Sequence, residues 1–241
     1  MKLMRTVINI AARHTVPDQH AVLKGQGIPD SAKPDKRTTE LASQAIKQYS
    51  KLAKPVGVVL DVGHDEFSDV YQGEGRNDER SPIESIFRNT SRLGLFAVTV
   101  GPDPGREITR LFRDSDFALG AMLDAAASAG AELAAEALER EWRQRLKIAG
   151  LLGPGQATMR FSPGYCGWHI SGQKKLFSVL QPSDIGIELN DRFLMQPLKS
   201  VSGVIAVGDK DIFRTGQDWP ACSGCKTRNC TERLLNLTRK H

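Results

Sequence analysis

The stretch from Arg160 to His169 concentrates residue types that bind small molecules. It reads Arg-Phe-Ser-Pro-Gly-Tyr-Cys-Gly-Trp-His. An arginine at the end of a strand offers a planar fork of N–H donors that fits a carboxylate or a phosphate. Ser162-Pro163-Gly164 favours a turn that exposes backbone groups, and aromatic residues follow on the same turn. Two interpretations are open from residue types alone: a small-molecule site built on Arg160, or a packed turn with a surface arginine.

Four cysteines form a second candidate site. Cys222, Cys225 and Cys230 follow the pattern Cys-x2-Cys-x4-Cys, and Cys166 lies far upstream of them. In a reducing compartment this spacing indicates a metal rather than a disulfide framework. With Cys166 as the fourth ligand it suits a 4Fe–4S cluster. With Cys166 or His169 as the fourth ligand it suits a structural zinc, and reduced, unliganded cysteines are the third possibility.

The elements that must position these residues belong to an ordinary globular composition. The chain has 241 residues, of which 40% are hydrophobic and 25% charged, and this composition excludes general disorder. The longest apolar runs, such as Leu95 to Val98, are far shorter than the roughly 18 residues of a membrane span. No signal peptide is visible at residues 1–7, so we expect a cytoplasmic protein with no membrane partner.

The net charge of +5 is concentrated near the C-terminus. Residues 226–241 hold five basic residues and one glutamate, so the rest of the chain is close to neutral. A basic tail beside a cysteine cluster permits a second class of function, a zinc-stapled binding or regulatory module that contacts nucleic acid without catalysis. Nucleic acid is disfavoured because no aromatic residue is interleaved with the basic residues after Trp219.

The apolar periodicity predicts an α+β fold, because helices come in runs and most strands cluster late in the chain. A long, alanine-rich segment at 116–149 is expected to form one helix or two in line, with Gly120 and Gly130 as candidate bends. Ser81-Pro82-x-Glu84 is typical of a helix start. Further helices are expected at 38–53 and 173–180, and strands at 56–62, 93–101, 159–161, 185–189, 193–196 and 201–207.

The order of these segments resembles the reactivation domain of cobalamin-dependent methionine synthase, which binds S-adenosylmethionine. The signature Arg-x-x-x-Gly-Tyr is met by Arg160, Gly164 and Tyr165. Blocks at 175–180, 185–190, 193–197 and 200–203 follow in the family's order, so the resemblance covers roughly residues 90–210. It implies a single C-shaped domain with a mainly antiparallel, twisted sheet. We expect an N-terminal extension at 1–60, the core at 61–210 and a cysteine-rich basic tail at 211–241.

The resemblance also implies a ligand site for S-adenosylmethionine. Arg160 would hold the carboxylate of the ligand, and Glu136 on the long helix would contact its amino group. Backbone groups of Phe161, Ser162 and Gly164 would approach the ligand. Tyr165, the candidate catalytic residue, would lie beside the ligand and face the corrin. The family also uses an N-terminal acidic residue, for which the candidates here are Asp61, Asp65 and Glu66.

The implied function is reductive reactivation of a cobalamin (corrinoid) methyltransferase in trans, supporting S-adenosylmethionine-dependent methylation of cob(I)alamin for methionine synthesis. The alternative is a zinc-stapled module that contacts nucleic acid or a corrinoid protein without catalysis. The chain has no Asp-x-His-x-x-Gly motif, so cobalamin is expected on a partner, either a corrinoid-carrying methyltransferase or the core of methionine synthase. An electron donor such as ferredoxin or flavodoxin is expected as well. Because the reaction needs an electron, a 4Fe–4S cluster is favoured over zinc at Cys166, Cys222, Cys225 and Cys230.

Overall fold

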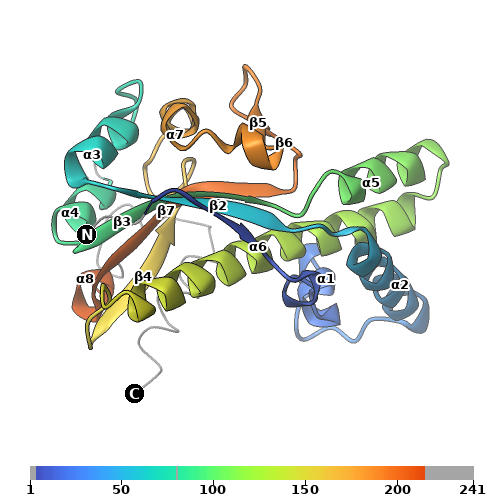
Figure 1. Ribbon diagram of the computed structural model, residues 1–241. Coiled ribbons are helices and arrows are strands. Elements are labelled where there is room, and N and C mark those ends of the chain that lie inside the picture. Colours follow the sequence, from blue (N-terminus) through green and yellow to red (C-terminus); the bar gives the residue numbers. More distant parts are fainter. Residues whose placement is uncertain (1–3, 80, 215–241) are drawn as a thin grey trace.

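A five-stranded antiparallel sheet forms the centre of the computed structural model, which describes residues 4–79 and 81–214 (Figure 1). The strand order is β1-β2-β3-β7-β4, and every neighbouring pair is antiparallel. The five strands are β1 (Thr6–Asn9), β2 (Val56–Val62), β3 (Arg92–Thr99), β4 (Gln156–Phe161) and β7 (Ser200–Asp209). Strand β7 therefore lies between β3 and β4, and β4 is an edge strand.

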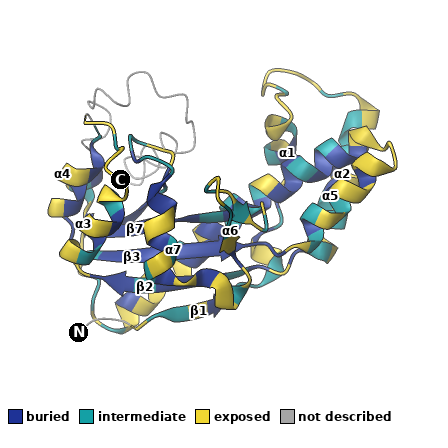
Figure 2. Ribbon diagram, turned by 90° about the horizontal axis from the view of Figure 1, so that it is seen from above, coloured by how far each residue is buried: buried dark blue, intermediate teal, exposed yellow. Residues whose placement is uncertain are grey.

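Helices cover both faces of this sheet (Figures 1 and 2). The helix α6 (Phe117–Ile148) crosses one face and extends beyond the strands, where it packs against three other helices. These are α1 (Gln19–Gly25), α2 (Lys36–Leu52) and α5 (Asp103–Arg113). The opposite face is covered by α3 (His64–Gln72), α4 (Ile83–Arg88) and α7 (Gly172–Leu180). Because strand side chains alternate, each face has its own apolar core.

Small residues bring α6 close to its neighbours. A Cβ at Gly94 of β3 would lie 2.7 Å from the Trp142 ring, and one at Gly57 of β2 would lie 2.8 Å from Leu138. Gly130 of α6 faces the Tyr49 side chain, which a Cβ there would overlap. The glycines that suggested bends thus permit close packing within one continuous helix. Helix α6 is long and apolar enough to cross a membrane by length and composition, but 56% of its most apolar window is buried, as in a core helix.

The α+β fold and the antiparallel sheet flanked by helices are confirmed. The strand expected at 185–189 is largely wrong: Pro182–Ile185 forms the 3-10 turn η2, and only β5 (Glu188–Leu189) is extended, paired with β6 (Met195–Gln196). Gly186, with a φ of 75°, lies between η2 and β5. The remaining elements are the 3-10 turn η1 (Ala12–His14) and α8 (Lys210–Arg214). The domain boundary expected at residue 60 falls inside β2.

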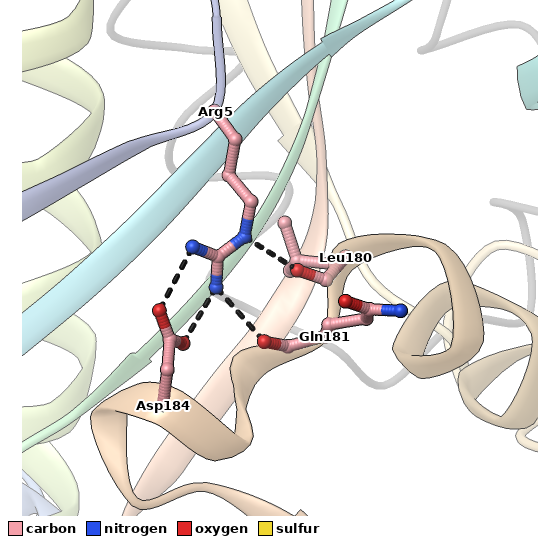
Figure 3. Close-up of polar contacts among 4 residues, drawn as sticks. All are labelled: Arg5, Leu180, Gln181 and Asp184. Carbon is pink, nitrogen blue, oxygen red and sulfur yellow. Dashed lines mark hydrogen bonds and ion pairs between the residues drawn. The ribbon is translucent and has the colours of Figure 1, made fainter.

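Arg5, just before β1, ties the start of the chain to the end of α7 (Figure 3). Its Nε donates to the carbonyl oxygen of Leu180 at 2.8 Å, and its Nη2 donates to that of Gln181 at 2.8 Å. Nη1 and Nη2 also donate to the two carboxylate oxygens of Asp184, at 2.8 and 2.6 Å. A cation here satisfies carbonyl groups that the end of a helix leaves unpaired. The contacts fix the C-terminal end of α7, whose N-terminal end follows the Arg160 turn.

Candidate functional site

Strand β4 sends alternate side chains to the two faces of the sheet. Met159 and Phe161 belong to the apolar core beneath α3, α4 and α7. Thr158 and Arg160 point the other way, toward α6. The last two residues of the strand therefore have different roles. Phe161 packs into an apolar core on one face, whereas Arg160 places a charge next to α6 on the other.

Arg160 is held by a glutamate of α6 that the sequence analysis did not select. The Arg160 side chain is 2% exposed, and its Nε donates to Oε2 of Glu139 at 2.7 Å. The Thr158 hydroxyl donates to the other carboxylate oxygen of Glu139 at 2.6 Å. Arg160 Nη2 is buried and has no hydrogen-bond partner among the described residues. An unpaired buried donor is costly, so this nitrogen is the natural place for an acceptor from a ligand.

The segment after β4 is a tight turn. The amide of Gly164 donates to the carbonyl of Trp168 at 2.7 Å, and the amide of Trp168 donates to that of Tyr165 at 2.9 Å. Gly164, Cys166 and Gly167 have φ values of 92°, 53° and 79°. Two of these positions are glycines, which adopt positive φ without steric cost. The turn leaves Tyr165 50% exposed, so its ring can be reached from outside.

Three hydrogen bonds fasten this turn to the loop that precedes α4. The amide of His169 donates to Oδ1 of Asn77 at 2.9 Å, and the Asp78 amide donates to the carbonyl of Gly167 at 2.9 Å. The hydroxyl of Ser81, expected to cap a helix, donates to the Cys166 carbonyl at 2.7 Å and also accepts from the Ile83 amide at 3.4 Å. Asn77, Asp78 and Ser81, which precede α4, thus support the site.

An aromatic cluster lies beneath the turn. The Trp168 ring is 1% exposed, and its centroid is 5.8 Å from that of Phe67 and 5.8 Å from that of Tyr71. Phe87 contacts Phe67 and also Phe161 of β4, with ring centroids 4.1 and 5.8 Å apart. Burial raises the pKa of Tyr71. The cluster therefore gives the turn a rigid, apolar base.

A cavity of about 310 Å³ lies between α3 and α4. Phe67, Tyr71 and Phe87 of the aromatic cluster form part of its wall. Its polar lining comes from His64, Asp65, Ser68, Glu84 and Arg88. Because its aromatic wall belongs to the core beneath the sheet, this cavity is on the face opposite to Arg160.

The predicted ligand residues of the turn lie close together, but the Phe161 side chain points away from them. Arg160, Ser162, Gly164 and Tyr165 lie together at the end of β4, while the Phe161 side chain is buried on the other face, so only its backbone is available. A Cβ at Gly203 would overlap the Phe161 carbonyl oxygen, so the glycine leaves room for that group.

The expected acidic residues have three different placements. Glu136 is exposed on α6, about one turn before Glu139, whose carboxylate contacts Arg160. Asp61 is 2% exposed and forms an ion pair with Arg92 of β3. Asp65 lines the cavity between α3 and α4, and Glu66 is half-buried on the same helix. The structure thus adds Glu139, which the sequence analysis missed, to the acidic groups beside the site.

Three of the four predicted metal ligands, Cys222, Cys225 and Cys230, lie outside the described residues. The fourth, Cys166, is half-buried in the turn after β4. Within residues 4–79 and 81–214 no group of three or more histidine, cysteine or acidic residues is arranged to hold a metal ion. The 4Fe–4S cluster and its zinc alternative therefore stay predictions from the sequence.

Fold and site together define an α+β domain that presents a buried, partly unsatisfied arginine at the end of an edge strand. A sequence profile of the family described as vitamin B12 dependent methionine synthase, activation domain, matches residues 82–217, and the chain belongs to this family. A solved structure described as the MetH reactivation domain bound to AdoHcy is similar in fold, with a TM-score of 0.61 and 17% identity. The similarity covers 100% of this chain and 91% of that one. Comparison with curated protein sequences gives no match.

Proposed function

We propose that this chain binds S-adenosylmethionine at the end of β4 and supports reductive reactivation of a corrinoid protein in trans. The observation that carries the proposal is the buried Arg160 guanidinium with an unpaired Nη2. In a member of the activation-domain family, this donor has a chemically suitable acceptor in the carboxylate of S-adenosylmethionine. The AdoHcy bound to the structurally similar MetH domain supports the same class of ligand.

The residues around Arg160 suit the methionine end of that ligand. Its α-carboxylate would accept from Arg160, and its α-ammonium would lie within reach of a carboxylate of α6, from Glu136 or Glu139. Backbone groups of Phe161, Ser162 and Gly164 would approach the rest of the ligand. The half-exposed ring of Tyr165 would lie between the ligand and the incoming corrin. The tyrosine would act by orienting the two reactants and excluding water.

The reaction proposed for the complex consists of one electron transfer and one methyl transfer. An electron from a donor of the ferredoxin or flavodoxin class reduces cob(II)alamin on the partner to cob(I)alamin. The sulfonium methyl group then passes to cobalt as its bond to sulfur breaks, giving methylcobalamin and S-adenosylhomocysteine. The partner would be a corrinoid methyltransferase or the core of methionine synthase, which links the chain to methionine formation.

The cysteine cluster is a separate part of the proposal. Cys166 directly follows Tyr165, so a cluster that included Cys166, Cys222, Cys225 and Cys230 would lie beside the proposed ligand site. A 4Fe–4S cluster there would supply one-electron chemistry, whereas zinc would only tether the C-terminal segment. Iron and sulfide analysis of anaerobically purified wild type and Cys225→Ser distinguishes them. Loss of iron in the variant supports the cluster, and stoichiometric zinc in wild type supports the alternative.

Calorimetric titration of the anaerobically purified chain with S-adenosylmethionine tests the binding proposal. Arg160→Ala is expected to abolish binding. Among the described residues of the site, Arg160 alone supplies a planar guanidinium that can donate to the carboxylate. Arg160→Lys is the matched control, since it keeps a cation beside Glu139 but lacks the planar fork, and it should weaken binding without abolishing the fold. Circular dichroism of both variants reports folding. Equal affinity in wild type and folded Arg160→Ala, or no wild-type binding at millimolar ligand, would contradict the proposal.

A further inference from the structure

Glu139 holds one edge of the Arg160 guanidinium and is itself bonded by Thr158, while Nη2 of Arg160 has no partner among the described residues. The Nε donor and the Thr158 hydroxyl each occupy one oxygen of the Glu139 carboxylate, at 2.7 and 2.6 Å. Glu139 is itself only 16% exposed, so the three side chains form a closed cluster between β4 and α6. The planar guanidinium has its five N–H donors in one plane. Fixing Nε therefore also fixes the direction in which Nη2 points.

Resting on the function proposed above, we propose that Glu139 and Thr158 are positioning residues, which orient Arg160 toward the carboxylate of S-adenosylmethionine. An arginine side chain has many rotamers, and ordering it when a ligand binds costs conformational entropy. In this protein the hydrogen bond from Nε to the Glu139 carboxylate fixes the guanidinium through contacts within the chain itself. A ligand then gains the hydrogen bond to Nη2 without the ordering cost, which is how preorganisation increases affinity.

The charges of the cluster also select the kind of ligand. Arg160 and Glu139 together are neutral, so the site does not attract anions in general by net charge. A carboxylate oxygen can accept more than one hydrogen bond, so Glu139 has acceptor capacity beyond Thr158 and Nε. A cation–anion pair of this kind is complementary to the zwitterionic end of an α-amino acid, whose carboxylate and ammonium groups are adjacent. The cluster of Arg160, Glu139 and Thr158, which we call the clamp, thus favours S-adenosylmethionine over an analogue without the carboxylate.

A purely structural role gives a different expectation. If the cluster served only to tie the edge strand β4 to α6, its loss would lower stability and would weaken all nucleoside ligands to a similar extent. A positioning role instead changes the discrimination between ligands with and without the carboxylate. The ratio of dissociation constants for decarboxylated S-adenosylmethionine and S-adenosylmethionine separates the two roles, because a general loss of affinity cancels in it.

The experiment measures this ratio by calorimetry for wild type, Glu139→Ala, Glu139→Gln and Thr158→Val. We expect Glu139→Ala to lower the ratio by about tenfold to a hundredfold, the range for a hydrogen bond to a charged group. Glu139→Gln should keep most of the ratio, because its amide oxygen can accept from Nε and its amide nitrogen can donate to Thr158. Thr158→Val should lie between them. Glu141→Gln, an exposed glutamate of the same helix paired with Arg145, is the control and should not change it.

The outcomes separate this inference from the function on which it rests. A wild-type ratio near one, unchanged by Arg160→Ala, would overturn both the ligand assignment and the clamp. The second outcome is a large wild-type ratio that Arg160→Ala abolishes. If Thr158→Val and Glu139→Ala both leave that ratio intact, the clamp is overturned and the ligand assignment stands. If Glu139→Ala does not fold, Thr158→Val decides, because it removes a single hydroxyl and leaves the ion pair in place. A lower ratio in Thr158→Val with wild-type stability supports the clamp.

Discussion

Two arginine–carboxylate pairs in this protein use the same chemistry differently. Arg5 donates from all three of its side-chain nitrogens, to two carbonyl groups at the end of α7 and to both oxygens of Asp184 (Figure 3). Arg160 donates from Nε to Glu139, and its Nη2 has no partner among the described residues. The Arg5 side chain is 29% exposed, whereas that of Arg160 is 2% exposed.

The difference separates a structural tie from a binding site. At Arg5, water can pair with any N–H that the protein leaves free. The full set of protein partners of Arg5 therefore indicates a structural contact and not a ligand site. At Arg160 burial restricts access to water, so an unpaired donor costs free energy that the fold does not recover. A buried group with an unmet hydrogen bond is therefore better evidence for a ligand than a well-paired surface cluster. Substitutions at the two arginines test this distinction.

The largest expected effect is on stability at the buried pair. Arg160→Met leaves the Glu139 carboxylate without its counter-charge, and we expect the free energy of unfolding to fall by about 3 kcal/mol, the lower end for a buried pair because Glu139 keeps some exposure. Urea denaturation measures the loss. The double variant Arg160→Met/Glu139→Met should recover most of it, because two apolar side chains can replace a buried ion pair. A double variant as unstable as the single one would contradict this account.

A pair of glycines provides the next comparison. A Cβ at Gly203 would overlap the carbonyl oxygen of Phe161, next to Arg160, while a Cβ at Gly186, near Asp184, would meet nothing within 4 Å. Gly203→Ala must displace backbone at the end of β4, so we expect a loss of about 2–3 kcal/mol. Gly186→Ala only forces a positive φ of 75° on alanine, which costs about 1 kcal/mol. Thermal and urea unfolding of the two variants check the order, and the reverse order would contradict it.

Sequence periodicity was sufficient for the elements with strong patterns. The helices α2 and α7, the long α6 and the strands β2 and β3 lie within a few residues of their expected positions. Helix α5 was missed, because Pro102 and Pro104 look like breakers and only Pro104, Ile108 and Leu111 are buried. Asp103, Arg106, Glu107 and Arg110 form ion pairs along the helix, which an apolar pattern does not detect.

The site itself was only partly predictable. The turn from Arg160 to Tyr165 could be found because its residues are contiguous. Thr158 and Arg160 also share a face by simple alternation, which was a usable signal. The sequence could not show which of Glu136 and Glu139 faces Arg160, since this depends on the rotation of α6 about its own axis over the sheet. That rotation is set by non-local contacts such as Trp142 on Gly94.

A smaller effect is expected at the exposed arginine. Arg5→Met removes the hydrogen bonds to Leu180 and Gln181 and the ion pair with Asp184, but water can replace each partner. We expect the free energy of unfolding to fall by about 1 kcal/mol or less. Urea denaturation beside Arg160→Met gives the comparison directly. A loss at Arg5 as large as that at Arg160 would show that burial does not distinguish the two pairs.

The smallest effect is a pH dependence at the same exposed pair. Hydrogen bonding by Arg5 lowers the pKa of Asp184 below its ordinary value of 3.8. A lowered pKa in the folded state means that the folded chain favours the carboxylate. The resulting stability is present above the ordinary pKa and is lost as the pH falls through the lowered one. The difference in melting temperature between wild type and Arg5→Met should therefore narrow as the pH falls from 5 to about 2.5. Asp184→Asn should show no such narrowing against its own Arg5→Met double variant. If the difference stays constant down to the acid limit, the carbonyl contacts of Arg5, and not its ion pair, account for its contribution.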